Sequence, residues 1–345
     1  MIRIFLLIGF SFIFFVSCKA RNNPRVFIFT DINIDAGDPD DRQSLVHLLW
    51  YSNELQIEGI VADRWNARSV EACKLAIGAY GDDYQKLSFI KQKYPTPENL
   101  VKLVANNTDE SFKLFANAVS DKSSPLNVLV WGNMESLSKI LLAHPEYSNN
   151  IRLITIGTGL MLEDDIKDMP KDWEKSKPCE QLNWNGFGRN AIYYNPQFNK
   201  MWWLEINWTY SGMFIGDEPK VMFNELSKYG NMGKHIKDVV KYEDWAQYFR
   251  VGDTPSVLYL LDPNHELDDP TQSSWAGKFV KPFPNLKPNY YTDYSGSQEW
   301  DYLNPCNTWE NHKFVRDEAT KTLLNRRSEM YHALIEKLNL IYPNN

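Results

Sequence analysis

Residues Val26 to Trp50 read VFIFTDINIDAGDPDDRQSLVHLLW and contain the pattern from which the fold can be predicted. The first five, Val26 to Thr30, are apolar or β-branched and predict a short buried strand. An acidic loop, Asp31 to Asp41, follows, and from Arg42 to Trp50 leucine and valine recur at helical spacing. Strand, loop and helix in this order begin a unit in which parallel strands alternate with helices.

The same alternation continues along the chain. Strands are predicted at Ile57 to Ala62, Asn127 to Trp131 and Ile151 to Ile156, and amphipathic helices at Ser69 to Ala79 and Ser136 to Ala143. Near-continuous apolar strands are typical of parallel sheets that are buried on both faces. The sequence therefore predicts an α/β fold with a mostly parallel, doubly wound sheet.

The remaining sequence indicates one domain. Leu162 to Pro196 is loop-like and rich in polar residues, and a loop of this length is more often functional, here as a lid or pocket wall. Val315 to Leu340 predicts one long amphipathic helix that docks back on the domain. Because no repeat and no Gly/Ser linker interrupts the chain, a single domain is expected over residues 19–345.

Residues 1–18 have the pattern of a lipoprotein-type signal peptide. Arg3 supplies a positive start, Ile4 to Val16 is largely apolar, and Ser17 precedes Cys18, the expected lipidation site. Phe15 departs from the usual aliphatic residue at its position, so ordinary signal cleavage is the alternative. We expect an exported protein, in the periplasm or at the outer membrane or cell surface, that meets the membrane only through its lipid anchor.

The composition excludes several classes of function. A net charge of -7 without a dense Lys/Arg run argues against nucleic-acid binding, and 43% hydrophobic residues argue against disorder. Zinc is not expected, because Cys73, Cys179 and Cys306 form no CxxC pair. Cys73 is predicted to be buried in a helix, and Cys179 could pair with Cys306. The twelve Trp and eighteen Tyr either pack or stack on sugar rings or nucleobases.

The acidic loop predicts a divalent cation site. It holds five carboxylates within eleven residues, and hard oxygen ligands at that density suit calcium, or magnesium as the alternative. Its position after a strand places it at the sheet edge where parallel sheets bind ligands. Asp38 with Pro39 reads as a helix start, with Asp38 as the N-cap. Asp40 and Asp41 point about 100° apart on a helix, so one can bind metal while the other meets a substrate hydroxyl.

Two further segments are candidates for the same site. Trp131 ends a predicted strand, so its free carbonyl is expected on the same sheet edge as Asp31. Asp253 precedes the helix-like run Val257 to Leu261 and is either its N-cap or a metal ligand.

Taken together, these segments resemble a known family. The acidic loop is similar to the aspartate-rich motif of the inosine-uridine nucleoside hydrolases. The closer match is to the nucleoside hydrolase-like family carried as a domain of unknown function, some members of which are labelled cellulose-binding. It includes Asp40 to Val61 (DDRQSLVHLLWYSNELQIEGIV), Leu129 to Asn133 (LVWGN) and Gly252 to Leu261 (GDTPSVLYLL). The resemblance spans most of Arg25 to Leu261 and implies a sheet of nucleoside hydrolase-like topology.

The resemblance also implies roles for individual residues. Those implied as ligands of a calcium ion are Asp31, Asp41, the carbonyl of Trp131 and Asp253. The resemblance further implies that Asp31 is the base that takes a proton from a water molecule activated by the cation. The residues implied as sugar-binding are Asp40, Asn66, Asn190, Glu205 and Asn207.

Three features depart from the family's pattern. The acidic loop is five residues longer than the Asp-x-x-x-Asp-Asp spacing of the enzymes. Gly252 stands where purine-cleaving enzymes often carry a histidine. Glu205-Ile206-Asn207 has the spacing of the sugar-binding Glu-x-Asn element without the Asp-Pro that follows it, and Asn190 and Asn195 are its rivals.

Two hypotheses of function follow. The first is a calcium-dependent hydrolase of a glycosidic bond that acts on an N-ribosyl or related glycosyl compound. The second is a non-catalytic, carbohydrate-binding surface lipoprotein with a structural calcium ion, suggested by Trp202, Trp203 and Trp208 and by the altered loop. A phosphohydrolase with Asp31 as nucleophile is not favoured, because Asp31-Ile32-Asn33 supplies no Asp-x-Asp pair. The partner is thus a small glycosyl or nucleoside-like substrate or a glycan, and an oligomer is left open.

Overall fold

The computed structural model describes residues 23–35, 39–64, 67–90, 93–158, 188–240, 248–297 and 309–343. In these ranges the strands are β1 (Arg25–Thr30), β2 (Gln56–Ala62), β3 (Val104–Ala105), β4 (Leu126–Trp131), β5 (Ile151–Ile156), β6 (Trp202–Ile206), β7 (Phe279–Val280) and β8 (Tyr290–Asp293). The α-helices are α1 (Asp40–Trp50), α2 (Ala67–Ser88), α3 (Pro97–Lys102), α4 (Thr108–Ser120), α5 (Glu135–Ala143), α7 (Arg189–Tyr193), α8 (Glu218–Leu226), α9 (Gly230–Asp238), α10 (Pro255–Leu261) and α11 (Trp309–Ile341). Three 3-10 helices are η1 (Pro145–Asn150), η2 (Pro196–Phe198) and η3 (Thr209–Met213).

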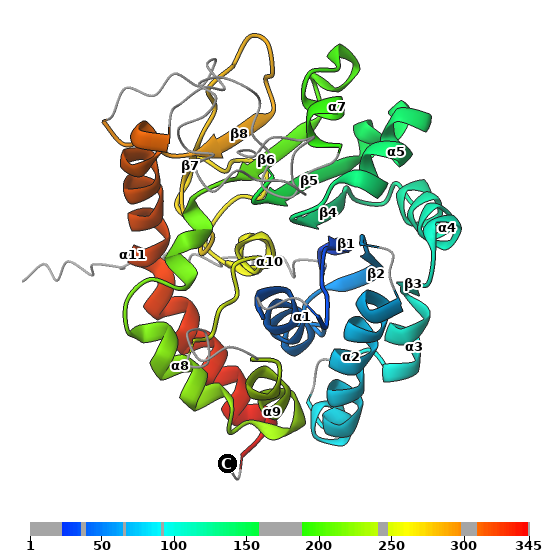
Figure 1. Ribbon diagram of the computed structural model, residues 1–345, viewed down its shortest axis with the longest axis vertical. Helices are drawn as coiled ribbons and strands as arrows, with labels where there is room; N and C mark the ends of the chain where they lie inside the picture. Colours follow the sequence, from blue (N-terminus) through cyan, green and yellow to red (C-terminus); the bar gives the residue numbers. More distant parts are fainter. Residues whose placement is uncertain are drawn as a thin grey trace, which may run out of the picture.

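The eight strands form one sheet in the order β3-β2-β1-β4-β5-β6-β8-β7 (Figure 1). All neighbouring pairs are parallel except β7 with β8, which is antiparallel. From β1 the chain runs to β2 and β3 on one side, and then to β4, β5, β6 and β8 on the other. The predicted mostly parallel α/β sheet is confirmed, and its strand order reverses between β1 and β4.

Both faces of this sheet are covered by helices. In β1 the side chains alternate, so that Val26 and Ile28 lie in one core and Phe27 and Phe29 in the other. Residues of α1, α2, α10 and α11 fill the first core, and residues of α4, α5 and α7 fill the second (Figure 1). The sheet is therefore doubly wound, and its strand ends are the open edge at which polar loops meet.

A close approach fixes the pairing of β1 with β2. The ring of Phe27 lies only 2.2 Å from the place where a Cβ of residue 59 would stand. Gly59 is therefore the only residue that fits, and the register shifts beside it, between Val26 and Phe27. The bulge directs the aromatic ring into the second core.

Most predicted elements are present with small shifts at their ends. The predicted strand over 151–156 agrees with β5, and the predicted helix over 69–79 is the middle of the longer α2. Of the predicted loop-like segment 162–196, residues 162–187 lie outside the described ranges. The prediction of a loop is wrong for residues 189–193, which form α7. Cys73 is buried as predicted. Residues 18, 179 and 306, with their predicted lipidation and pairing, lie outside the described residues. No helix in the described part of the chain is both long and apolar enough to cross a bilayer.

Candidate functional site

The acidic loop lies where the strand order of the sheet reverses. Asp31 directly follows β1, and its backbone N–H donates to the carbonyl oxygen of Trp131, the last residue of β4, at 3.2 Å. Open parallel sheets bind ligands outside the carboxyl ends of their strands at such a topological switch point. The position of the loop therefore favours a binding role.

Three carboxylates from two distant parts of the chain meet at this point. Asp40 and Asp41 are the first two residues of α1, and Asp253 precedes α10 by two residues. One oxygen from each lies within 4.8 Å of the others. Oxygen ligands of this kind suit calcium or magnesium. The structure thus brings two of the predicted metal ligands, Asp41 and Asp253, close to Asp40, which was predicted as a sugar contact. We call these three residues the carboxylate cluster.

The helix caps differ from the sequence-based expectation. Asp38, the predicted cap, lies outside the described residues, and α1 begins at Asp40 with Pro39 in the N-cap position. The prediction that Pro39 is the first helical residue is therefore wrong by one position. The N-cap of α10 is Thr254, without a side-chain capping bond. The N-cap alternative for Asp253 is therefore also wrong, and its carboxylate belongs to the cluster.

The electrostatics of the cluster favour a cation. Burial raises the pKa of Asp41 well above its ordinary value, and the charges of Asp31, Asp253 and Asp40 raise it further. A hydrogen bond from the Thr30 hydroxyl lowers it in part. Without a counter-charge, Asp41 keeps a proton more readily than an isolated aspartate does. A divalent cation would let all three carboxylates ionise, so the donor set fits such an ion.

Asp31 lies beside the carboxylate cluster but is not one of its three members. Its carboxylate forms an ion pair with Arg64 at 3.0 Å and is 10% exposed. The Trp131 carbonyl accepts backbone N–H groups from Asp31 at 3.2 Å and from Asn133 at 3.3 Å. Because a carbonyl oxygen has two lone pairs, the prediction of a free carbonyl at Trp131 is wrong. Asp31 remains close enough to raise the pKa of Asp41.

A buried aspartate that the sequence analysis did not select fixes the loops on either side of β1. Asp63, 1% exposed at the end of β2, accepts hydrogen bonds from the backbone N–H and the hydroxyl of Ser136. The Asn133 amide donates to the Asp63 carbonyl at 2.8 Å. Burial raises the pKa of Asp63 to about 7, although Ser136 lowers it in part. These bonds tie the end of β2 to the turn after β4. Asn66, a predicted sugar-binding residue on this loop, lies outside the described residues.

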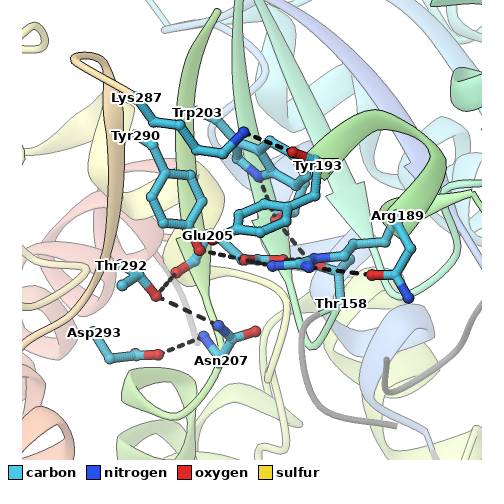
Figure 2. Close-up of polar contacts among 12 residues, drawn as sticks. Thr158, Arg189, Tyr193, Trp203, Glu205, Asn207, Lys287, Tyr290, Thr292 and Asp293 are labelled. Carbon is cyan, nitrogen blue, oxygen red and sulfur yellow. Dashed lines mark hydrogen bonds and ion pairs between the residues drawn. The ribbon is translucent and has the colours of Figure 1, made fainter. Parts of the chain in front are cut away.

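A second group of polar residues surrounds Glu205 on β6 (Figure 2). The carboxylate of Glu205 is fully buried and accepts two hydrogen bonds from the guanidinium of Arg189, at 2.8 and 2.6 Å. Thr158 and Tyr290 each donate a hydroxyl to the same carboxylate. Arg189 holds the pKa of Glu205 below its ordinary value, against the effect of burial. These four protein hydrogen bonds leave the predicted sugar contact of Glu205 without support from the structure.

Asn190, on α7, joins the same group through its side chain. Its side-chain oxygen accepts a hydrogen bond from Arg189 at 3.2 Å, and the residue is 8% exposed. The guanidinium of Arg189 also lies over the ring of Tyr193, 3.8 Å from its centre. Sugar binding by Asn190 stays a prediction.

Asn207 lies at the end of β6, on the same sheet edge as the carboxylate cluster. Asp293, at the end of β8, accepts a hydrogen bond from the backbone N–H of Asn207 (Figure 2), and it also accepts from the backbone N–H groups of Trp208 and Thr209. The Asn207 side chain donates to Thr292 at 3.4 Å, whereas its oxygen is buried and has no hydrogen-bond partner in the described part of the chain. An unsatisfied buried acceptor costs about 1–3 kcal/mol, so a donor from a ligand would be favourable here.

The tryptophans proposed as a sugar-stacking surface pack inside the protein. Trp203 and Trp208 are 3% and 4% exposed. Trp202 packs on Tyr259 and Tyr291, with ring centres 6.2 and 5.6 Å away. Trp203 and Trp208 are therefore buried, Trp202 is partly buried against the core, and the packing alternative holds for all three.

A parallel α/β sheet with a carboxylate cluster after its first strand defines a nucleoside hydrolase-like protein. Residues 25–279 match the family model described as "Cellulose-binding Sde182, nucleoside hydrolase-like domain", and the chain belongs to this family. A search of the curated proteins found no match.

Among solved structures, the chain is similar to a nucleoside hydrolase-related hypothetical protein from Saccharophagus degradans that is associated with carbohydrate metabolism. The identity is 17%, the TM-score is 0.61, and the match covers 94% of this chain and 73% of that chain. Weaker likenesses include the inosine-uridine preferring nucleoside hydrolase from Bacillus anthracis (14% identity, TM-score 0.45, 86% and 99% covered). Another is the type III effector protein XopQ complexed with adenosine diphosphate ribose (12% identity, TM-score 0.47, 88% and 95% covered). Only the likeness to the Saccharophagus degradans protein, with a TM-score of 0.61, supports the fold.

Proposed function

We propose that this protein is a calcium-dependent hydrolase of a glycosidic bond in an N-ribosyl or related glycosyl compound. The observation that carries the proposal is the carboxylate cluster of Asp40, Asp41 and Asp253 at the topological switch point. A divalent cation held there would supply Lewis-acid activation of a water molecule.

The protein's own groups divide the remaining work. Asp31 stands at the edge of the cluster, where its carboxylate can receive the proton that the attacking water loses, and the ion pair with Arg64 orients it. The buried side-chain oxygen of Asn207 can accept a hydrogen bond from a sugar hydroxyl. The Arg189–Glu205 pair then acts as a rigid support under this second part of the site rather than as a substrate contact.

The test combines metal content with activity. The purified protein is analysed for bound calcium, and the wild type, Asp41→Asn and Asp35→Asn are assayed with inosine, uridine and p-nitrophenyl β-D-ribofuranoside. Asp35 is a matched control, because it is an exposed carboxylate on the same loop, 3.7 Å from Arg68. We expect calcium and activity to be lost in Asp41→Asn and retained in Asp35→Asn. Wild-type protein that binds calcium but releases no product from any of the three compounds would exclude hydrolysis of these substrates.

A second function is favoured by the family description, which names cellulose binding. In this alternative the protein binds a glycan without cleaving it, and the cation is structural. Binding of cellulose or cello-oligosaccharides by the Asp31→Asn variant, with no product after prolonged incubation of the wild type, is the result that would favour it. Export and a lipid anchor at Cys18 stay predictions under both functions, and labelling with radioactive palmitate in the native host would test them.

A further inference from the structure

The loop that carries Asp253 has no side chain at position 252, and Asp40, Tyr210 and Phe214 border the space beside it. A Cβ at Gly252 would stand 3.0 Å from an oxygen of Asp40 and 3.5 Å from Cδ2 of Tyr210. Asp40 and Tyr210 therefore lie against the same short piece of backbone. Tyr210 belongs to η3, which follows β6, so it adds a second segment of the chain to the wall of the carboxylate cluster.

The phenol of Tyr210 lies in a strongly acidic environment. Burial raises the pKa of its hydroxyl above the ordinary value, and the charges of Asp40, Asp253 and Asp293 raise it further, against the effect of Arg250. A phenol is protonated at neutral pH in any case, so the Tyr210 hydroxyl can serve as a hydrogen-bond donor. No hydrogen bond from it is found among the residues that the structure describes.

The position of Tyr210 is fixed from both sides. The carboxylate of Asp293 accepts hydrogen bonds from the backbone N–H groups of Trp208 and Thr209, the two residues before Tyr210. The ring of Tyr210 packs against Phe214, with ring centres 5.8 Å apart. Tyr210, beside the carboxylate cluster, therefore lies only three residues after Asn207 in the chain.

We propose that Tyr210 is a sugar-contacting residue whose hydroxyl donates a hydrogen bond to one hydroxyl of a vicinal diol, while Asp40 accepts from the neighbouring hydroxyl. A donor and an acceptor on one wall match two adjacent sugar hydroxyls, each of which can donate and accept. The absent Cβ at Gly252 leaves room for the carboxylate of Asp40. The inference rests on the proposed function only in requiring a glycosyl ligand, and it does not require bond cleavage.

The experiment is a calorimetric titration of calcium-loaded protein with methyl β-D-ribofuranoside and with methyl β-D-glucopyranoside. Tyr210→Phe keeps the ring and removes only the hydroxyl. Tyr94→Phe is the matched control, because its buried hydroxyl donates to the Trp50 carbonyl and makes no contact with the cluster. We expect Tyr210→Phe to weaken binding of the preferred sugar about three- to tenfold, the effect of one hydrogen bond, and to change the Kd of calcium less than about twofold. Tyr94→Phe is expected to change neither.

A second variant keeps the test decisive if Tyr210→Phe folds poorly. Gly252→Ala places a methyl group 3.0 Å from an oxygen of Asp40, which must shift, and it is expected to weaken both calcium and sugar binding. Sugar affinity that is equal in the wild type and Tyr210→Phe, or the absence of binding of either sugar to the calcium-loaded wild type, overturns the inference. Sugar binding that depends on Tyr210 without any product release rejects the proposed hydrolysis and retains the inference.

Discussion

Replacing Asp41 by Asn is expected to stabilise the cation-free protein and to destabilise the calcium-loaded protein relative to the wild type. Two ionised carboxylates 4.8 Å apart repel by about 3.5 kcal/mol at an effective dielectric constant near 20, and Asp41 has two such partners in the cluster. Because the pKa of Asp41 is raised, the wild type relieves part of this repulsion by holding a proton on Asp41 more readily than an ordinary aspartate does. We therefore expect a net gain of only about 1–3 kcal/mol for Asp41→Asn in EDTA at pH 8.

The pH dependence has a defined sign. The pKa of Asp41 is raised in the folded protein above the ordinary value of 3.8, so the folded state binds this proton more tightly than the unfolded state does. The stability that this group contributes is therefore lost as the pH rises through its folded pKa. The advantage of Asp41→Asn in EDTA should accordingly grow from pH 5 to pH 8.

Calcium should reverse the order of stability. At a calcium concentration about 1,000 times Kd, the wild type gains about 4 kcal/mol, and the variant gains less because it has lost a charged ligand. Urea unfolding at pH 5, 6.5 and 8, in EDTA or in calcium, measures both effects, with Asp35→Asn as the control. The reasoning is refuted if Asp41→Asn is less stable than the wild type in EDTA at pH 8 and responds equally to calcium.

Two further predictions concern buried groups outside the cluster. His47 is fully buried, and burial lowers its pKa to about 3, so stability is lost as the pH falls from about 6.5 toward 3. The wild type should lose about 2 kcal/mol between pH 8 and pH 5 that His47→Phe does not lose, and equal losses in urea unfolding would contradict this. Arg189→Met leaves Glu205 buried without its cation and should cost about 3–5 kcal/mol, much of which is recovered in the double variant Arg189→Met/Glu205→Leu. A double-mutant cycle measures this coupling, and a cost below about 1 kcal/mol for the single variant would show that the pair contributes little.

The sequence predicts the first half of the sheet well because local signals there are strong and consistent. The five apolar residues from Val26, the acidic loop and the leucine-rich helix each favour the element that forms. The second half is less predictable. β6 carries a buried glutamate inside an apolar run, and β8 is only four residues long, so neither has a clear local pattern. The partners that stabilise them come from distant parts of the chain.

The site is predictable to the same extent. Asp41 and Asp253 were selected from the sequence, but only the fold could show that Asp253 does not cap α10 and that Asp40 lies with them. Asp293 was missed, because it is the last residue of a four-residue strand, Tyr290–Asp293, that was not predicted from the sequence. Tyr210 has no sequence signal, because only the fold brings its ring to the backbone of Gly252, beside which an oxygen of Asp40 also lies.

We expect the carboxylate cluster to hold a divalent cation. A crystal structure of the protein in calcium chloride, with an anomalous difference map, tests it most directly. We predict one calcium ion about 2.3–2.6 Å from carboxylate oxygens of both Asp41 and Asp253. A well-ordered cluster without an anomalous peak, or a calcium ion bound elsewhere and touching neither residue, would contradict the account.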